Sequence, residues 1–501
     1  MTFLGIDRTL HPSLDEINFL QAGTGAVQRD AQSKMRDIVS VKDFGAVGDG
    51  VTDDTAAIQA AIDAGKPYST STINGRLIYF PPGRYKVSTI DLTACHGVHL
   101  LGAGAYATEI FTSGTNQVIK AIGSSSAPLN KAGVTEMIIR GGGAANASAH
   151  GIDIQWGHTC YLENLVFFGC RHALNLAHQF QTYLTSINVH GEGTDQNYIG
   201  VFMDVTDLTF IDNAVIANGV MVQSTTGYGF RIINGQGSKF VNCEAGGSPM
   251  IHGWYIGDPA SGTVKCQWIH FANCLGDSTS SATWLFRQGT ASELSQMQLS
   301  NCWGSNGDHG FFFDGARNMV LTGTQGHGSA KSGVTLNSCQ EIVLSGGVFQ
   351  ANNEDAGAAI ADVMIQNSLY CIVTGITSNT NVAGKSLIET AGTDGSIIYG
   401  NNLFQGATII GAASRVFRNT AFVTEASGTG TIADSTTVAT ITHGLSRTPA
   451  AKDIWVTFTE NPSTDPGNIW IDTITSTQFN VNCRTNPGAS HLDFSWGARV
   501  T

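Results

Sequence analysis

Two carboxylates follow a repeated Asn-Cys pair in the middle of this 501-residue chain. Glu244 comes two residues after Asn242, and Asp277 comes four residues after Asn273. If these asparagines hold equivalent positions in adjacent strands about 4.8 Å apart, the two acids lie about 8 Å from each other. An acid and a base that act across one glycosidic oxygen with inversion need roughly 6.5 to 9.5 Å. The spacing therefore predicts an acid/base pair for glycoside hydrolysis.

Other acids could take part or compete. Asp308, in the next repeat, would orient a water or a sugar as a third catalytic residue. All three acids could instead be solvated turn residues, because Asp is common beside Gly in turns. A rival active site consists of the three acids in MDVTDLTFID, which are Asp204, Asp207 and Asp212. Asp212 falls at a repeated position, so its role could be purely structural.

Aromatic and polar residues gather in the same stretch as the paired acids. Aromatic rings stack on the apolar faces of sugars, so an exposed ring in a groove makes a good subsite. The candidates for substrate contact are Trp303, Trp254, His309, Arg287, His327 and Tyr228. Trp268 alternates with apolar residues in QWIHF and is expected in the core, while Arg287 could be an ordinary surface arginine.

A repeated pattern must position these side chains. Between about residues 70 and 420, a short strand, a small or polar residue and a Gly-rich turn recur at steps of 22 to 31 residues. Such irregular periods predict a β-solenoid whose like positions stack from coil to coil. The asparagines would bond amide to amide at a turn, while the following cysteines fill one interior slot. The repeated positions are Asn164, Asn188, Asp212, Asn242, Asn273, Asn301, Gly323, Gly346, Gly375 and Asn401, and the stacked cysteines are Cys243, Cys274 and Cys302.

The two ends differ from the repeats. Residues 53–65 read as a helix with one apolar face that caps the first coil, since an open coil is an unpaired sheet edge. After a Gly/Ser/Thr-rich boundary, strict alternation predicts a small all-β domain over 425–501. The expected fold is all-β, with segments 1–40, 41–424 and 425–501.

Composition excludes several functions. With a formal net charge of -13 and only 26 scattered Lys and Arg, the chain is not expected to bind nucleic acid. Ten cysteines without CxxC spacing predict reduced, buried side chains, and no His or Cys spacing predicts a metal site or a cofactor. No run of about 18 apolar residues occurs, and the start lacks a basic segment before an apolar run. We therefore expect no membrane insertion and synthesis in a cytoplasm.

Both ends resemble known families. VSVKDFGAVGDGVTDDTAAIQAAIDAG (39–65), followed by LIYFPPGRYKV, resembles the opening of the pectate-lyase-like right-handed parallel β-helix proteins. The preceding GTGAVQRDAQSKMRDI is similar to the segment found before it in bacteriophage tailspikes, and residues 442–483 resemble a C-terminal module of phage tail proteins. The resemblance covers about a quarter of the chain.

The resemblance implies a homotrimeric spike on a virion that binds, and usually cleaves, a surface polysaccharide of the host bacterium, such as a capsule, an exopolysaccharide or an O-antigen. Residues 1–40 would hold the spike to the phage tail or baseplate, and residues 425–501, a β-sandwich-like domain, would hold three chains together or touch sugar. Such a spike assembles in the host cytoplasm and acts at the outer surface of the host cell.

Three activities fit this outline. The paired acids favour an endoglycosidase. A polysaccharide lyase would instead use a Lys, Arg, Tyr or His base against a uronic acid, but a negatively charged chain is a poor host for an acidic polymer. The other alternative is an adhesin that binds sugar without cutting it.

Overall fold

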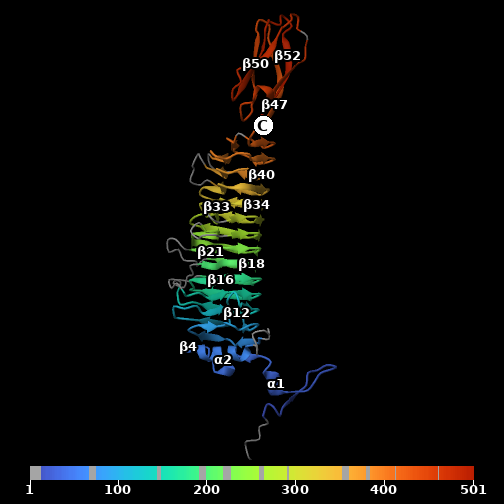
Figure 1. The fold of residues 1–501 in the computed structure, drawn as a ribbon. Helices are drawn as coiled ribbons and strands as arrows, with labels where there is room; N and C mark the ends of the chain where they lie inside the picture. The colour runs from blue at the N-terminus through green and yellow to red at the C-terminus, as the bar shows by residue number, and fades with distance from the viewer. Residues whose placement is uncertain are drawn as a thin grey trace, which may run out of the picture. The chain divides into compact units, whose positions relative to one another are not determined.

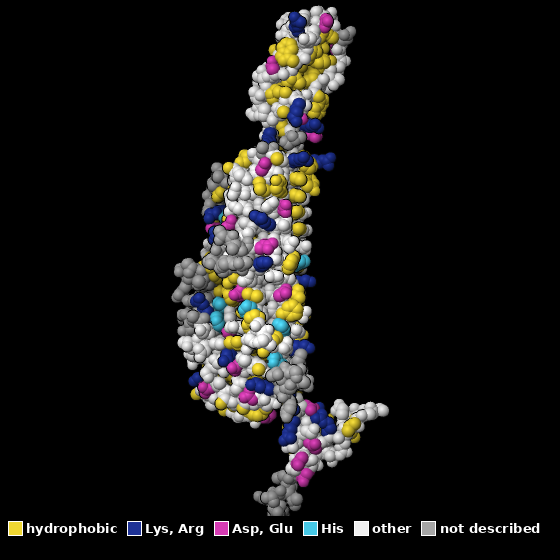
Figure 2. All heavy atoms as spheres, in the orientation of Figure 1, with side chains coloured by type: hydrophobic (Ala, Val, Ile, Leu, Met, Phe, Trp, Pro, Cys, Tyr) yellow, Lys and Arg dark blue, Asp and Glu magenta, His cyan; other side chains and the backbone are white. Residues whose placement is uncertain are grey.

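The computed structural model describes residues 13–66, 75–143, 148–190, 199–217, 227–258, 265–289, 293–352, 360–379, 384–411, 413–460 and 462–500. The chain forms two compact units, 1–226 (unit 1) and 227–501 (unit 2). Short parallel strands stacked coil on coil make up most of each unit (Figure 1). The visible surface is mostly white in Figure 2, with scattered charged side chains, which fits the low charged fraction of 13%. Within the described ranges, no helix is both long and apolar enough to span a membrane.

Unit 1 begins with short elements and a capping helix. The short elements are β1 (Asn18–Phe19), β2 (Arg29–Asp30), α1 (Ala31–Met35) and η1 (Val41–Phe44). Helix α2 (Thr55–Gly65) buries Ile58, Ala61 and Ile62 and contacts the strands β3, β5 and β7. A Cβ added at Gly65 would meet Ile78 Cδ1 at 2.6 Å, so this glycine lets the helix end approach β5 closely. The predicted capping helix is confirmed.

Three columns of parallel strands form the coils of unit 1. The first column holds β3 (Val39–Ser40), β5 (Leu77–Phe80), β8 (His99–Gly102), β12 (Gly133–Arg140), β15 (Tyr161–Phe168), β17 (Tyr183–Val189) and β19 (Phe210–Asp212). The second holds β4 (Asp49–Asp53), β6 (Gly83–Lys86), β9 (Thr108–Phe111), the second halves of β12, β15 and β17, and β20 (Val215–Ala217). The third holds β7 (Ile90–Asp91), β10 (Ile119–Ile122), β13 (Ile152–Gln155), β16 (His172–Phe180) and β18 (Ile199–Asp207), and the short strands β11 (Leu129–Asn130) and β14 (Gly157–His158) follow it.

Unit 2 repeats this plan. Its first column holds β23 (Lys239–Val241), β27 (His270–Ala272), β31 (Gln298–Ser300), β34 (Arg317–Thr322), β37 (Gln340–Ser345), β40 (Ile372–Thr374), β43 (Ile397–Tyr399) and β46 (Arg415–Phe417). Its second holds β24 (Glu244–Met250), β28 (Leu275–Thr279), β32 (Trp303–Ser305), β35 (Gln325–His327), β38 (Val348–Gln350), β41 (Thr377–Asn379) and β44 (Asn402–Leu403). Its third holds β21 (Tyr228–Ile232), β25 (His252–Ile256), β29 (Trp284–Arg287), β33 (His309–Asp314), β36 (Ser332–Asn337), β39 (Ala361–Gln366), β42 (Lys385–Glu389) and β45 (Ala407–Thr408), with β22 (Gly235–Gln236), β26 (Lys265–Gln267) and β30 (Glu293–Ser295) after it.

Like side chains stack in the interior of unit 2. Cys243, Cys274 and Cys302 are buried at one inward position, as predicted. Along the third column, the rings of Phe230, Trp254, Trp284 and Phe311 stack with successive centroid distances of 4.0, 4.5 and 5.6 Å. All ten cysteines are buried and none forms a disulfide, which confirms that prediction.

A turn between the first and second columns carries the repeated asparagines and glycines. Asn242, Asn273 and Asn301 have φ of 52°, 53° and 53°, and Asn273 Nδ2 donates to Asn242 Oδ1 at 3.3 Å. Asn and Gly adopt this left-handed conformation at least cost, which explains why they recur. The same conformation continues at Gly323 and Gly346.

We call this column of left-handed turn residues the turn ladder. Three of its members were predicted one or two residues away from their positions in the structure. The left-handed residues are Ser186, Asn213 and Gly400 rather than Asn188, Asp212 and Asn401. Strand pairing gives the reason, because Asn188 lies inside β17, opposite Val215, and Asp212 lies at the end of β19, opposite Thr185.

The C-terminal part of unit 2 consists of two three-stranded antiparallel sheets. One sheet has the order β47 (Glu425–Ile432), β52 (Leu492–Arg499), β49 (Ile454–Phe458), and η2 (Ala451–Asp453) precedes β49. The other has the order β48 (Val438–Thr442), β51 (Gln478–Cys483), β50 (Ile469–Asp472). Their buried residues, which include Ile432, Ile441, Phe479, Val481 and Phe494, form one core. The sandwich-like C-terminal module is confirmed; the trimer and the segment boundaries stay predictions.

Candidate functional site

Glu244 and Asp277, the predicted acid/base pair, lie on two outward ladders of the second column in unit 2. Strands β24, β28, β32 and β35 pair in parallel, and their residues point alternately inward and outward. Of the outward positions, Gly246 and Ser305 are buried. One outward ladder consists of Glu244, Leu275, Trp303 and Gln325, and the other, two residues further along, of Gly246, Asp277, Ser305 and His327. We call these eight residues the outward patch.

The pairing of β24 with β28 gives the same offset between Glu244 and Asp277 from which their separation was predicted. Glu244 lies opposite Leu275, and Asp277 lies opposite Gly246, so the two acids are separated by one strand step and two residues. That offset corresponds to about 8 Å. Glu244 is exposed and Asp277 is half-buried, while Ala245 between the ladders is buried. Both carboxylates therefore reach the same outer face.

Neighbouring side chains fix the Asp277 carboxylate. Ser305 Oγ donates to Asp277 Oδ1 at 2.6 Å, and Asn306 Nδ2 donates to the same oxygen at 2.8 Å. An ionised carboxylate accepts such donors without giving a proton in return. This arrangement suits a carboxylate that keeps one oxygen anchored and presents the other to a water.

An aromatic ring lies beside Asp277. Trp303 precedes Ser305 by two residues on β32 and lies in the ladder of Glu244. Glu244 and Trp303 are therefore each offset from Asp277 by one strand and two residues, on opposite sides of it. Its residue exposure is 39%, and its ring centroid is 6.5 Å from that of His327. The outward patch thus combines two acids, a partly exposed indole and an imidazole.

Two tryptophans are placed differently from expectation. Trp254 is fully buried in the interior stack, and its Nε1 donates to the Leu275 carbonyl at 3.0 Å, so the prediction that it contacts substrate is wrong. Trp268 is 51% exposed with φ of 55°, and the core prediction for it is also wrong. The cause is the same in both cases: inward and outward positions depend on where each strand ends, and the spacing of apolar residues alone does not give that.

Three other predicted site residues lie outside the outward patch. Asp308 follows β32 in a turn and forms an ion pair with Lys331 at 2.8 Å. His309 Nδ1 lies 2.7 Å from Ser332 Oγ, and burial lowers the pKa of His309 to about 4, so it is neutral at neutral pH. Arg287 pairs with Asp314 at 3.3 Å. The outward patch brings together Glu244, Asp277, Trp303 and His327, and these three residues are not members of its ladders.

A second polar cluster lies on the outer side of the third column in unit 2, with Arg231, His252 and Tyr255 buried. The Arg231 guanidinium lies 3.7 Å from the ring centroid of Tyr255 and forms an ion pair with Asp258 at 3.0 Å. The rings of Tyr228 and His252 stack at 5.9 Å, because the two residues are opposite each other on β21 and β25. Burial raises the pKa of both tyrosines and lowers that of His252 to about 4.

The sequence singled out only Tyr228 of this cluster as a substrate contact, although Tyr255 was among the aromatic residues noted in the same stretch. Arg231 and Tyr255 are opposite each other on β21 and β25, 24 residues apart in the chain. The neighbouring coil steps differ in length, so this pairing could be found only once the register was known.

The rival acids belong to unit 1. Asp204 and Asp207 lie on β18, opposite Ala177 and Phe180, and Asp212 ends β19. Val205, between the first two acids, is left-handed with φ of 51°. These acids stay a candidate site of unit 1.

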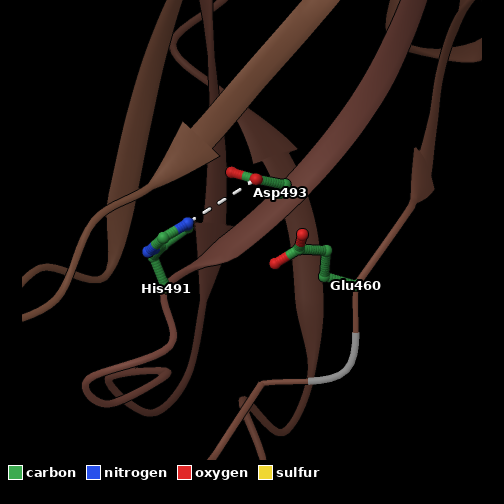
Figure 3. A group of neighbouring side chains, drawn as sticks. All are labelled: Glu460, His491 and Asp493. Atoms are coloured by element: carbon green, nitrogen blue, oxygen red, sulfur yellow. Dashed lines mark ion pairs between the residues drawn. The ribbon is translucent and has the colours of Figure 1, made fainter.

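One group of side chains in the C-terminal module has the composition of a cation site. Figure 3 shows Glu460, His491 and Asp493 turned toward one another, with one ligand atom from each within 4.8 Å of the others. His491 Nε2 lies 3.6 Å from Asp493 Oδ2. The three could hold a divalent metal ion, but Glu460 and His491 are exposed, and exposed acidic groups are common without a metal. We therefore assign no metal to this group.

Comparison with known proteins supports the fold. Residues 38–141 match the family described as rhamnogalacturonase A/epimerase, pectate lyase-like. Mannuronan C5-epimerase AlgE1 of Azotobacter vinelandii is 49% identical over 77 residues, which are 14% of this chain and 5% of that protein. A probable glucan endo-1,3-beta-glucosidase of Arthroderma benhamiae is 57% identical over 53 residues, 10% of this chain and 6% of that protein. The chain thus spans only a small part of these curated relatives.

Solved structures match over most of the chain. A tailspike protein mutant of E. coli bacteriophage HK620 in complex with pentasaccharide has a TM-score of 0.61 at 12% identity, with 97% of each chain covered. Tailspike protein 3 of bacteriophage CBA120 has a TM-score of 0.55 at 12% identity, covering 92% of this chain and 70% of that one. The A-module of the A. vinelandii epimerase AlgE4 has a TM-score of 0.55 at 21% identity, covering 75% and 99%. The chain has the pectate-lyase-like parallel β-helix fold, which it shares with phage tailspikes and epimerase modules.

Proposed function

We propose that this chain is a phage tailspike enzyme that binds a bacterial surface polysaccharide and hydrolyses it within the polymer. One observation carries the proposal: adjacent strands β24 and β28 present Glu244 and Asp277 on one outer face, with the partly exposed Trp303 beside them. Two carboxyl groups offset by about 8 Å leave room for a water between them and the sugar, as inversion requires.

In this mechanism Asp277 acts as the base. It takes a proton from a water, whose oxygen forms a bond to the anomeric carbon, while Glu244 gives its proton to the leaving glycosidic oxygen as that bond breaks. Glu244 is exposed in the free chain, so it is accessible to bound polysaccharide. Trp303 stacks on a neighbouring sugar ring, and His327 lines the same face.

The rest of the proposal concerns the particle. Residues 1–40 attach the chain to the phage tail or baseplate, three copies form the spike, and the spike acts at the outer surface of the host cell. Support comes from the fold shared with phage tailspikes and from the sequence resemblance of residues 23–65.

The experiment is product analysis on a panel of purified bacterial capsules, exopolysaccharides and O-antigens. Hydrolysis predicts new reducing ends and saturated fragments by mass spectrometry. Glu244→Gln and Asp277→Asn are each expected to lower the rate by about 100-fold to 10,000-fold, the usual worth of an acid or base. Asp314→Asn, which removes an acid outside the outward patch, is the matched control. Full activity in either of the first two variants contradicts the assignment, and binding without shortening means an adhesin.

A second candidate, β-elimination, is favoured by the cluster of Tyr228, Arg231, His252 and Tyr255. A lyase needs a base and a cation beside a uronate, and these four residues offer tyrosines, a neutral imidazole and a guanidinium. The pair of Arg231 with Asp258 speaks against a free cation. Unsaturated product ends, seen by ultraviolet absorbance and lost in Tyr228→Phe, would support the lyase over the hydrolase.

A further inference from the structure

On the outer face of the sheet β47–β52–β49, the exposed side chain of Trp455 lies over Gly497. Trp455 is 52% exposed, and a Cβ added at Gly497 would meet its Cζ2 at 2.2 Å and its Cε2 at 2.3 Å. Trp455 and Gly497 are opposite each other on β49 and β52. The indole therefore lies across the glycine, and a residue with any side chain at 497 would push it away.

Small hydroxyl side chains lie on one side of this ring, and Glu425 and Arg499 form the row on its other side. The strand register puts Ser427 in the row of Gly497 and Trp455, and puts Thr429, Ser495 and Thr457 in the next row. The outward side chains of both rows are exposed or half-buried. The face thus offers one aromatic platform and a row of hydroxyl groups that both donate and accept hydrogen bonds.

The chemistry of this face matches a sugar better than a protein partner. A pyranose puts its apolar C–H face on an aromatic ring and its hydroxyl groups in reach of other hydroxyls. Three strands about 4.8 Å apart and two or three rows about 6.8 Å apart span roughly 200 to 300 Å². A standard protein interface needs about 800 Å² on each partner.

The charges of the face favour a neutral sugar over an anionic one. The row beyond the hydroxyls ends in Asp493, with Glu460 and His491 beside it (Figure 3). Asp493 also accepts a hydrogen bond from Thr431 Oγ1 at 2.5 Å. At the other end of β52, Arg499 lies 3.7 Å from Asp453. A uronate or sulfate would meet carboxylates at one end and an already paired guanidinium at the other.

We infer that this face of the C-terminal module is a second glycan-binding site, centred on Trp455, for one or two pyranose units of a neutral stretch of polysaccharide. The inference rests on the proposed function only for the class of ligand; it does not depend on Glu244 or Asp277. The site would hold the chain on the polymer while cleavage takes place elsewhere.

The test uses the full chain on a printed array of purified bacterial surface polysaccharides, neutral and anionic. Trp455→Ala is expected to weaken apparent affinity for at least one neutral glycan by about tenfold, the loss of one good ring contact. Trp470→Ala is the matched control, since Trp470 lies on β50 of the other sheet at 46% exposure, with its Nε1 bonded to Asp472 at 3.1 Å. It should bind like the wild type.

A second variant keeps the indole but moves it. Gly497→Ala puts a Cβ where the Trp455 ring lies, so binding should fall as in Trp455→Ala while the thermal unfolding midpoint confirms a folded chain. The inference is overturned by unchanged binding in Trp455→Ala, by equal losses in Trp470→Ala, or by no binding of the wild type to any glycan. A changed oligomeric state of Trp455→Ala in sedimentation would assign the face to a subunit contact and also overturn it. Reducing-end release, measured in parallel, reports separately on the proposed hydrolysis.

Discussion

The inward and outward ladders of the second column in unit 2 differ in how they change from strand to strand. Inward, the chain repeats one kind of residue, such as the three stacked cysteines and the small residues Ala245, Gly276, Gly304 and Gly326. Outward, it changes at every step, from Glu244 to Leu275, Trp303 and Gln325. Repeating one residue type along an inward ladder lets adjacent coils pack on one another. Changing the residue type along an outward ladder does not improve that packing. Residues that change along an outward ladder are therefore the better guide to function.

The two tryptophans Trp254 and Trp303 test this contrast most strongly. Trp254→Ala removes a fully buried indole from the interior stack, so we expect a loss of about 3–5 kcal/mol in the free energy of unfolding. Trp303→Ala should cost little stability and lower affinity for polysaccharide instead. Urea unfolding and binding measurements on both variants check this. Equal stability losses would remove the distinction between the two positions.

Buried Asp362 is an exception to the apolar interior and predicts a pH dependence. Burial raises its pKa to about 6, although Asn352 Nδ2 at 2.8 Å and Ser378 Oγ at 2.6 Å donate to it. Because the folded pKa lies above the unfolded value, its contribution to stability is full below about pH 4 and is lost as the pH rises through about 6. The loss is at most about 3 kcal/mol.

Asp362→Asn should flatten the dependence of stability on pH. Urea midpoints of the wild type should fall between pH 4 and pH 7, and those of the variant should fall less. Exposed Asp434→Asn is the control and should follow the wild type. An unchanged profile in Asp362→Asn would show that this carboxyl does not titrate in that range.

The smallest effect on the free energy of unfolding is expected for substitutions in the turn ladder. Gly323 has φ of 63°, and a Cβ there would meet Asn301 Oδ1 at 2.5 Å. Gly323→Ala should therefore cost about 1–2 kcal/mol of unfolding free energy. Asn301→Gly, one coil earlier in the same conformation, should change it by less than about 0.5 kcal/mol. A neutral Gly323→Ala would mean that the turn relaxes.

Members of the turn ladder can be identified from the sequence only where they are Asn or Gly. Asn242, Asn273 and Gly323 were found because few other residues accept a left-handed turn cheaply. Ser186 adopts the same left-handed conformation, but serine does not indicate it in a sequence, so this member of the turn ladder is predicted at Asn188 instead. The fold survives this error, because the interior periodicity does not depend on one turn.

The candidate site is less predictable than the fold. The offset between Glu244 and Asp277 followed from two asparagines that do occupy equivalent turns. Trp254 was misplaced because the third column has no such marker, and apolar residues occur on both of its faces. Arg231 was missed because its partner Tyr255 lies one coil away and only the register joins them.

The most direct test of the account is a double-mutant cycle on cleavage rate. Glu244→Gln, Asp277→Asn and the double variant are compared on one susceptible polysaccharide by reducing-end release. If both carboxyls serve one hydrolytic step, the double variant should be about as slow as the slower single variant, because the effects of groups that act as a unit are not additive. Losses that multiply, or a single variant with full activity, would contradict the pairing of these two acids across the outward patch.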